Sequence, residues 1–192
     1  MSIATLAALV LAAAVSAGAA VPPADEVSIT ATTASDGTQV LVHETEVAAP
    51  VTQVWEAIST ARGWTTWAVP VAWLEGDLIE TSYTPGAAPG DPSTIQQQIL
   101  AREPGRRLVF RTIKAPEGFP HFDAYRQVVV TIELETLGET ATRVRLTSTG
   151  YPDSEAGRTL AGFFRDGNRS TLEQLRQRFV SGPIDWSTAL GD

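Results

Sequence analysis

The sequence of residues 45–58 is TEVAAPVTQVWEAI, which predicts the end of a β-strand and, directly after it, a short helix. The strand covers 38–47, where successive side chains alternate between an apolar and a more polar face. Pro50 ends this strand and is well tolerated in the first turn of a helix. Apolar residues at helical spacing then continue as far as Gly63.

The chain downstream of this helix alternates between apolar and polar residues in short runs that are separated by turn residues. Such runs predict strands at 71–75, 78–84, 94–102, 107–114, 126–136 and 142–150. Because tight turns join most of these strands, we expect antiparallel pairing.

A long helix is predicted over 155–180, and it would extend about 39 Å at 1.5 Å per residue. Its predicted packing face carries Leu160, Phe163, Phe164, Gly167, Thr171, Leu175 and Phe179. An amphipathic helix of this length needs an apolar concavity to cover, so the sequence predicts an α+β fold.

The composition of the chain excludes several classes of function. The chain has 192 residues, no cysteine and a formal net charge of −8. This size suits one folded domain, and the lack of cysteine excludes disulfides and thiolate metal sites. Because a net negative chain repels phosphate backbones, we expect no nucleic-acid partner. The two histidines lie far apart, and no nucleotide, nucleophile-elbow or metal motif occurs, so we expect neither metal nor cofactor.

Residues 1–20 contain no charged side chain, and their apolar run ends in Ala17-Gly18-Ala19. This pattern predicts a signal peptide and an exported (periplasmic or secreted) protein, or else an uncleaved membrane anchor that would be the only membrane contact. Residues 21–37 are predicted to form a linker or an extra edge strand, and 183–192 a C-terminal tail.

Two stretches carry a resemblance to a known superfamily. Residues 45–58, followed by Trp64 and Trp67, resemble the opening of START-like (SRPBCC) proteins. Residues 102–110, with the sequence REPGRRLVF, are similar to a strand pair in the branch named for the activator of the heat-shock protein 90 ATPase. The resemblance implies a helix-grip domain over 38–182, in which a curved antiparallel sheet wraps around the long C-terminal helix and encloses a cavity.

Candidate ligand-binding residues come mainly from aromatic side chains in segments that this fold would bring to the concave face. They are Trp64, Trp67, Trp73, Phe110, Phe119, Phe122, Tyr125, Phe163 and Phe164. His43 joins them by strand parity, either as a ligand-facing polar group or as a hydrogen-bonded core residue. Gly167 and Thr171 place small groups on the packing face of the long helix, which indicates either a cavity or close contact with a strand.

The resemblance implies no single function, and we expect binding of a small hydrophobic or amphipathic ligand in the internal cavity, without catalysis. Two alternatives stay open: an enzyme similar to polyketide cyclases and dehydratases, and a protein-interaction module that uses the exterior of the sheet. The residues themselves assign no catalytic group.

Overall fold

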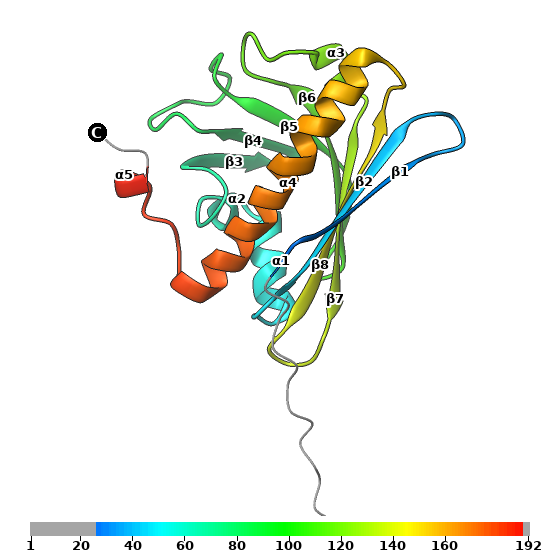
Figure 1. Ribbon diagram of the computed structural model, residues 1–192. Coiled ribbons are helices and arrows are strands. Elements are labelled where there is room, and N and C mark those ends of the chain that lie inside the picture. The colour runs from blue at the N-terminus through cyan, green and yellow to red at the C-terminus, as the bar shows by residue number, and fades with distance from the viewer. Residues whose placement is uncertain (1–25, 190–192) are drawn as a thin grey trace, which may run out of the picture.

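The computed structural model describes residues 26–189, which form one antiparallel eight-stranded sheet with a long helix across its concave face (Figure 1). The strands are β1 (Ser28–Thr33), β2 (Gln39–Val47), β3 (Val71–Glu75), β4 (Leu78–Ser82), β5 (Ile95–Glu103), β6 (Arg107–Lys114), β7 (Val129–Thr136) and β8 (Thr142–Tyr151). The helices are α1 (Val51–Ser59), α2 (Ala61–Trp64), α3 (Phe122–Tyr125), α4 (Glu155–Ser181) and α5 (Trp186–Ala189). The predicted α+β helix-grip architecture is confirmed.

The strands follow the order β1-β2-β8-β7-β6-β5-β4-β3, and every neighbouring pair is antiparallel. β2 pairs with β1 on one side and with β8 on the other, so the beginning of the chain joins the last strand of the sheet. β1 is an edge strand of the sheet. It lies within residues 21–37, for which the sequence predicted either a linker or an extra edge strand. β7 begins three residues later than predicted, because residues 122–125 form the short helix α3.

α4 begins at a well-formed cap. The Ser154 hydroxyl accepts a hydrogen bond from the backbone N–H of Gly157 at 3.1 Å. A Cβ at Gly157 would lie 2.0 Å from the carbonyl oxygen of Pro152, so only glycine fits at this close approach. The contact fixes where the helix starts and how its first turn faces the sheet.

The packing face of α4 is rotated relative to the prediction. Its buried residues are Gly157, Leu160, Ala161, Leu172 and Leu175. Phe163, which the sequence placed on the packing face, is 61% exposed. The aromatic character of Phe163 suggested burial, but Ala161 and Leu172 define a stripe that passes beside it.

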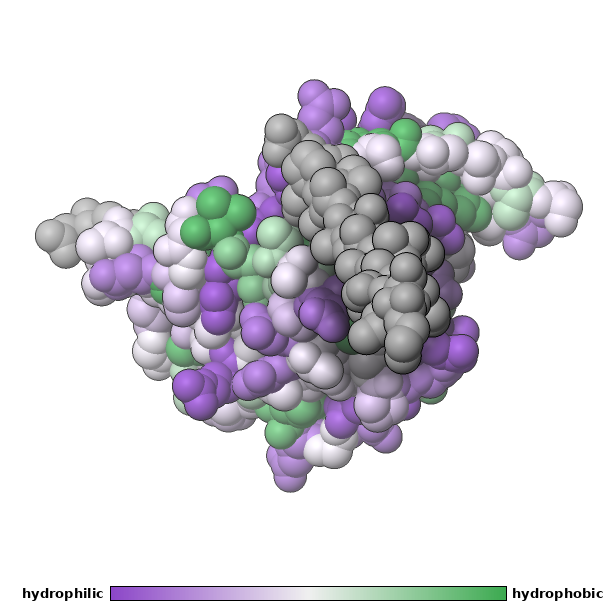
Figure 2. Space-filling view, turned by 90° about the horizontal axis from the view of Figure 1, so that it is seen from below, coloured by the Kyte–Doolittle hydropathy of each residue, from purple (hydrophilic) through white to green (hydrophobic). Residues whose placement is uncertain are grey.

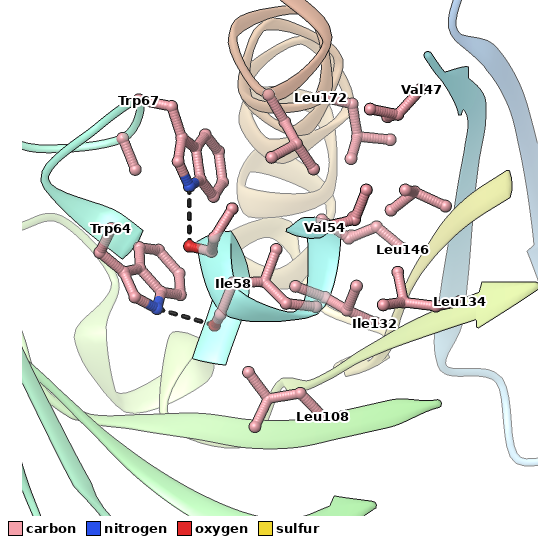
Figure 3. Packing of buried hydrophobic residues seen from close by; sticks show 14 of the residues in the cluster. Val47, Val54, Ile58, Trp64, Trp67, Leu108, Ile132, Leu134, Leu146 and Leu172 are labelled. Atoms are coloured by element: carbon pink, nitrogen blue, oxygen red, sulfur yellow. Dashed lines mark hydrogen bonds between the residues drawn. The ribbon is translucent and has the colours of Figure 1, made fainter. Parts of the chain in front are cut away.

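The main core lies where α1 and α2 meet the lower half of the sheet (Figures 1 and 3). Trp64 donates its indole N–H to the carbonyl of Ile58 at 2.8 Å, and Trp67 donates to the carbonyl of Ala57 at 3.0 Å (Figure 3). Both carbonyls belong to the last turn of α1, where a helix leaves acceptors without internal partners. The two tryptophans therefore stabilise the end of α1 while they fill the core.

The convex face of the sheet carries several ion pairs between side chains on neighbouring strands. Arg143 lies 2.8 Å from Glu135 and 3.4 Å from Glu46, and Arg145 lies 2.7 Å from Glu44. Glu44 and Glu46 of β2 and Glu135 of β7 therefore have arginine partners on the neighbouring strand β8. Seen from below, the surface is mainly hydrophilic, with small separate apolar patches (Figure 2).

None of the helices within residues 26–189 combines the length and the apolar character needed to cross a bilayer. The predicted targeting segment, 1–20, lies outside the described residues.

Two glycines of α4 should respond oppositely to the same substitution. Gly157→Ala is expected to reduce the free energy of unfolding by about 1–3 kcal/mol, because its methyl group would overlap Pro152. A Cβ at Gly167 would meet no atom within 4 Å apart from its own helix backbone and chain neighbours. Gly167→Ala should therefore add up to about 1 kcal/mol through helix propensity. Urea unfolding of both variants checks the pair, and equal effects at the two positions would contradict the packing described for α4.

Candidate ligand-binding cavity

A cavity of about 260 Å³ lies between α4 and the concave face of the sheet. Strands β4 to β8 form its floor, α2 and the residues after it close one end, and α4 forms the roof. Because α4 packs by a narrow stripe, the wide concave face is covered only in part by its side chains. The space left beneath the helix is the cavity.

One aromatic group closes the end of the cavity near α2. Trp64 stacks on Trp67 with ring centroids 5.5 Å apart, and Phe110 meets Trp64 edge-on at 6.4 Å. All three residues are buried and line the cavity. The indole N–H groups of Trp64 and Trp67 both donate to carbonyls of α1, so this end of the cavity presents apolar ring surface.

A second aromatic group lies at the end near α3. Tyr125 stacks on Phe164 at 4.6 Å and contacts Phe119 at 5.2 Å. Tyr151 lies 6.3 Å from the Phe164 ring, and Phe163 meets that ring edge-on at 5.1 Å. Rings from α3, α4, β8 and the loop after β6 thus converge on one side of the cavity. Both ends suit a ligand with flat apolar surface.

The polar side chains in the wall are all neutral. Asn168 donates a hydrogen bond from Nδ2 to the Ser148 hydroxyl at 3.1 Å, which links α4 to β8. All three tyrosines of the chain line the cavity. Burial raises the pKa of the Tyr125 and Tyr151 phenols, so both stay protonated at neutral pH. Among residues 26–189, no charged side chain and no histidine lines the cavity.

The mouth of the cavity is marked by two exposed side chains in its wall. Tyr83 is 62% exposed and Phe163 is 61% exposed, yet both line the cavity. The loop that follows Tyr83 is held by Lys114, whose Nζ donates to the carbonyls of Gly90 and Asp91 at 3.0 and 2.6 Å. This rim of the mouth is therefore tied to β6.

Most of the sequence candidates are brought together at the cavity. Those that line it are Trp64, Trp67, Phe110, Phe119, Tyr125, Phe163, Phe164 and Thr171. Four residues that the sequence predicted in the cavity do not line it: His43, Trp73, Phe122 and Gly167.

These four corrections have separate physical causes. Trp73 alternates with Ala72 and Leu74, which pack on the core, so its side chain lies on the opposite face of β3. Phe122 begins α3 and lies in an outer groove beside Pro152. Gly167 is beside the wall but has no side chain to reach it.

His43 is a core residue that holds α4 to β2. Its side chain is fully buried, and Nε2 donates a hydrogen bond to the carbonyl of Arg165 at 2.9 Å. Nδ1 is buried without a partner among the described residues. Burial lowers the pKa of His43, the hydrogen bond to Arg165 opposes this shift, and the charges of Arg169 and Arg165 add to it.

Protein stability should therefore fall on mild acidification. An unfolded histidine has a pKa of about 6.5, so the unfolded chain binds a proton before folded His43 does, and acid favours unfolding. We expect the free energy of unfolding to decrease between about pH 7 and about pH 5. His43→Gln, whose amide can still donate to Arg165, should flatten this dependence. Urea unfolding across that range is the measurement, and an unchanged slope in the variant would contradict the assignment.

Several wall residues were missed by sequence reasoning. Ser148 alternates with Val144 and Leu146 along one strand, and Asn168 lies four residues from both Phe164 and Leu172. That spacing could have identified Asn168. Tyr83 and Gln97 carried no comparable signal.

Metal binding finds no support in the side-chain arrangement. Within residues 26–189, no three His, Cys, Asp or Glu side chains gather as a metal ion would require.

Solved structures share this architecture. The Aha1 dimer from Colwellia psychrerythraea is 15% identical, with a TM-score of 0.57 over 74% of this chain and 97% of that chain. CalU16 from Micromonospora echinospora is 21% identical, with a TM-score of 0.55 over 83% of this chain and 86% of that one. Norcoclaurine synthase from Thalictrum flavum, solved with dopamine and hydroxybenzaldehyde, is 16% identical, with a TM-score of 0.52 over 74% and 86%. At these identities the likeness shows the fold alone.

No curated protein matches the chain in sequence. A family model described as "Polyketide cyclase / dehydrase and lipid transport" matches residues 38–180, which include all of β2 to β8 and nearly all of α4. The START-like superfamily predicted from residues 45–58 and 102–110 is thereby confirmed. On the match over most of its length, the chain belongs to the polyketide cyclase, dehydrase and lipid-transport family.

Proposed function

We propose that this protein binds a small apolar or amphipathic molecule in the cavity beneath α4 and does not catalyse a reaction on it. The observation that carries the proposal is the neutral wall: no Asp, Glu, Lys, Arg or His of residues 26–189 lines the cavity. General acid–base catalysis near neutral pH relies mostly on histidine or carboxylate groups. Burial raises the pKa of the Tyr125 and Tyr151 phenols, so both stay protonated at neutral pH and cannot serve as a base.

Contact area would supply most of the affinity. Burying apolar surface contributes roughly 25 cal/mol per Å², and aromatic rings at both ends of the cavity offer such surface. The volume of about 260 Å³ is just below the usual range of ligand pockets, roughly 300–1,000 Å³, which favours a small ligand. The Ser148–Asn168 pair supplies a polar position at the roof.

Native mass spectrometry of the protein purified from its own host tests this proposal. We expect a non-covalent adduct that is released by denaturation and keeps its mass during prolonged incubation. An adduct that changes mass on incubation would instead support the cyclase-like or dehydratase-like enzyme. A protein that carries no adduct and takes up no apolar probe would contradict cavity binding and favour the interaction module.

The proposal also places the protein outside the cytoplasm. Its support is the uncharged apolar run that ends in Ala17-Gly18-Ala19. N-terminal sequencing should find a mature chain that begins near Ala20 or Val21. A soluble cytoplasmic pool that still begins at Met1 or Ser2 would overturn export, and full-length protein in the membrane fraction would indicate an anchor.

A further inference from the structure

One polar atom of the cavity wall lacks a hydrogen-bond donor. Gln97 lies on β5 and lines the cavity, and its Oε1 is buried without a partner among residues 26–189. A buried amide oxygen without a donor carries a desolvation penalty that a hydrogen bond would relieve. Because the surroundings are apolar, an unpaired amide oxygen destabilises the folded protein, so its presence in the wall needs an explanation.

Strand alternation gives Gln97 its position, because Ile95 on the same face of β5 also lines the cavity and Ile99 lies in the core. Gln96, Gln97 and Gln98 are consecutive, and the register of β5 against β6 shifts between Gln96 and Gln97. The extra residue of this bulge is Ile113 of β6, opposite Gln96 and Gln97, and such bulges are common beside functional sites. Of the three glutamines, only Gln97 lines the cavity, while Gln98 donates its amide N–H to the carbonyl of Asp77 at 3.1 Å.

The cavity also restricts the ligand. Its wall has aromatic groups at both ends and no charged side chain among the described residues, so a charged group deep inside would stay unpaired. A cavity of roughly 150 Å³ engineered in another protein accommodates benzene. The present volume of about 260 Å³ therefore fits a molecule with one or two aromatic rings.

We propose that the ligand is an uncharged aromatic molecule with a hydroxyl group, and that the Gln97 amide orients it by hydrogen bonding to this hydroxyl. The inference rests on the proposed function, because it assigns chemistry to the same cavity. A hydroxyl suits the position because it can donate to Oε1 and accept from Nε2. The aromatic walls then supply affinity, and Gln97 supplies selectivity.

The test compares two probes of nearly equal shape, 2-naphthol and 2-methylnaphthalene, by calorimetric titration at neutral pH. The wild-type protein should bind the naphthol more tightly. Gln97→Leu should weaken naphthol binding about threefold to tenfold, the effect of one lost hydrogen bond, and leave methylnaphthalene binding equal or tighter. Gln98→Leu is the matched control, because its side chain lies outside the cavity wall, and it should retain the wild-type preference.

The outcomes separate this inference from the proposed function. If both probes bind the wild type but Gln97→Leu changes both affinities equally, or neither, the role of Gln97 is wrong and cavity binding stands. If neither probe binds the wild type, the aromatic-ligand inference fails, and cavity binding fails with it only if native mass spectrometry also finds no adduct. Should Gln97→Leu melt well below the wild type, Gln97→Met provides an unbranched apolar replacement, and the same loss of preference is required of it.

Discussion

Val130→Phe is expected to abolish most ligand binding while the protein remains folded. Val130 lies on β7, lines the cavity and packs against both hydrophobic clusters, so its side chain faces the space between the two aromatic groups. A phenyl group at this position would occupy the space that a ligand ring needs. Losing the burial of one such ring corresponds to roughly 1.5–3 kcal/mol, or about tenfold to a hundredfold in affinity.

The stability of Val130→Phe distinguishes a cavity from a closed core. If the space is real, the larger side chain fills it, and the free energy of unfolding should change by less than about 1 kcal/mol. Val129→Phe is the matched control, because strand alternation places Val129 on the opposite face of the sheet. Titration of both variants with 2-methylnaphthalene, alongside urea unfolding, is the measurement. A strong loss of stability with unchanged binding in Val130→Phe would contradict the cavity.

Trp67→Ala is expected to reduce the free energy of unfolding by about 3–5 kcal/mol, the range seen when buried tryptophan or phenylalanine is truncated. The Trp67 side chain is 1% exposed, stacks on Trp64 and donates a hydrogen bond to the last turn of α1. Its removal leaves a large void and an acceptor without its donor. Since a domain of this kind is stable by only about 5–15 kcal/mol, this change should bring the protein close to unfolding.

The chain offers a control for this substitution in a second tryptophan. Trp73 is only partly buried and lies on the outer face of β3, so Trp73→Ala should cause a clearly smaller loss. Urea unfolding followed by far-ultraviolet circular dichroism avoids the change in tryptophan fluorescence. Equal losses for the two variants would show that Trp67 is not the anchor of the core described here.

The order of helices and strands could be predicted because their apolar patterns are strong. Alternation located β6 and β8 within one residue of their observed ends, and the Pro50 and Gly182 boundaries located α1 and α4. The packing face of α4 could not be predicted in detail, because small residues such as Gly157 and Ala161 are buried in it and carry little hydrophobic signal. Phe163 was therefore predicted to be buried, whereas it lines the mouth of the cavity and is 61% exposed.

The candidate site was predictable only where residue type decides burial. Trp64, Trp67 and Phe110 follow from aromatic residues in strand and helix patterns. The face of His43 also followed from parity, but its partner, the Arg165 carbonyl, is 122 positions away in sequence. Gln97 shares a face of β5 with Ile95 and Ile99, so alternation could have placed it inward, but nothing in the sequence shows that its amide oxygen lacks a partner.

A crystal structure of the protein grown with 2-naphthol tests the central claim most directly. Binding inside the cavity predicts electron density for the naphthyl ring beneath α4, between the Trp64 and Tyr125 aromatic groups, with its hydroxyl within hydrogen-bond distance of the Gln97 amide. The same crystals of Val130→Phe should lack this density. Density on the convex face of the sheet, or a cavity that stays empty at saturating probe, would contradict the account.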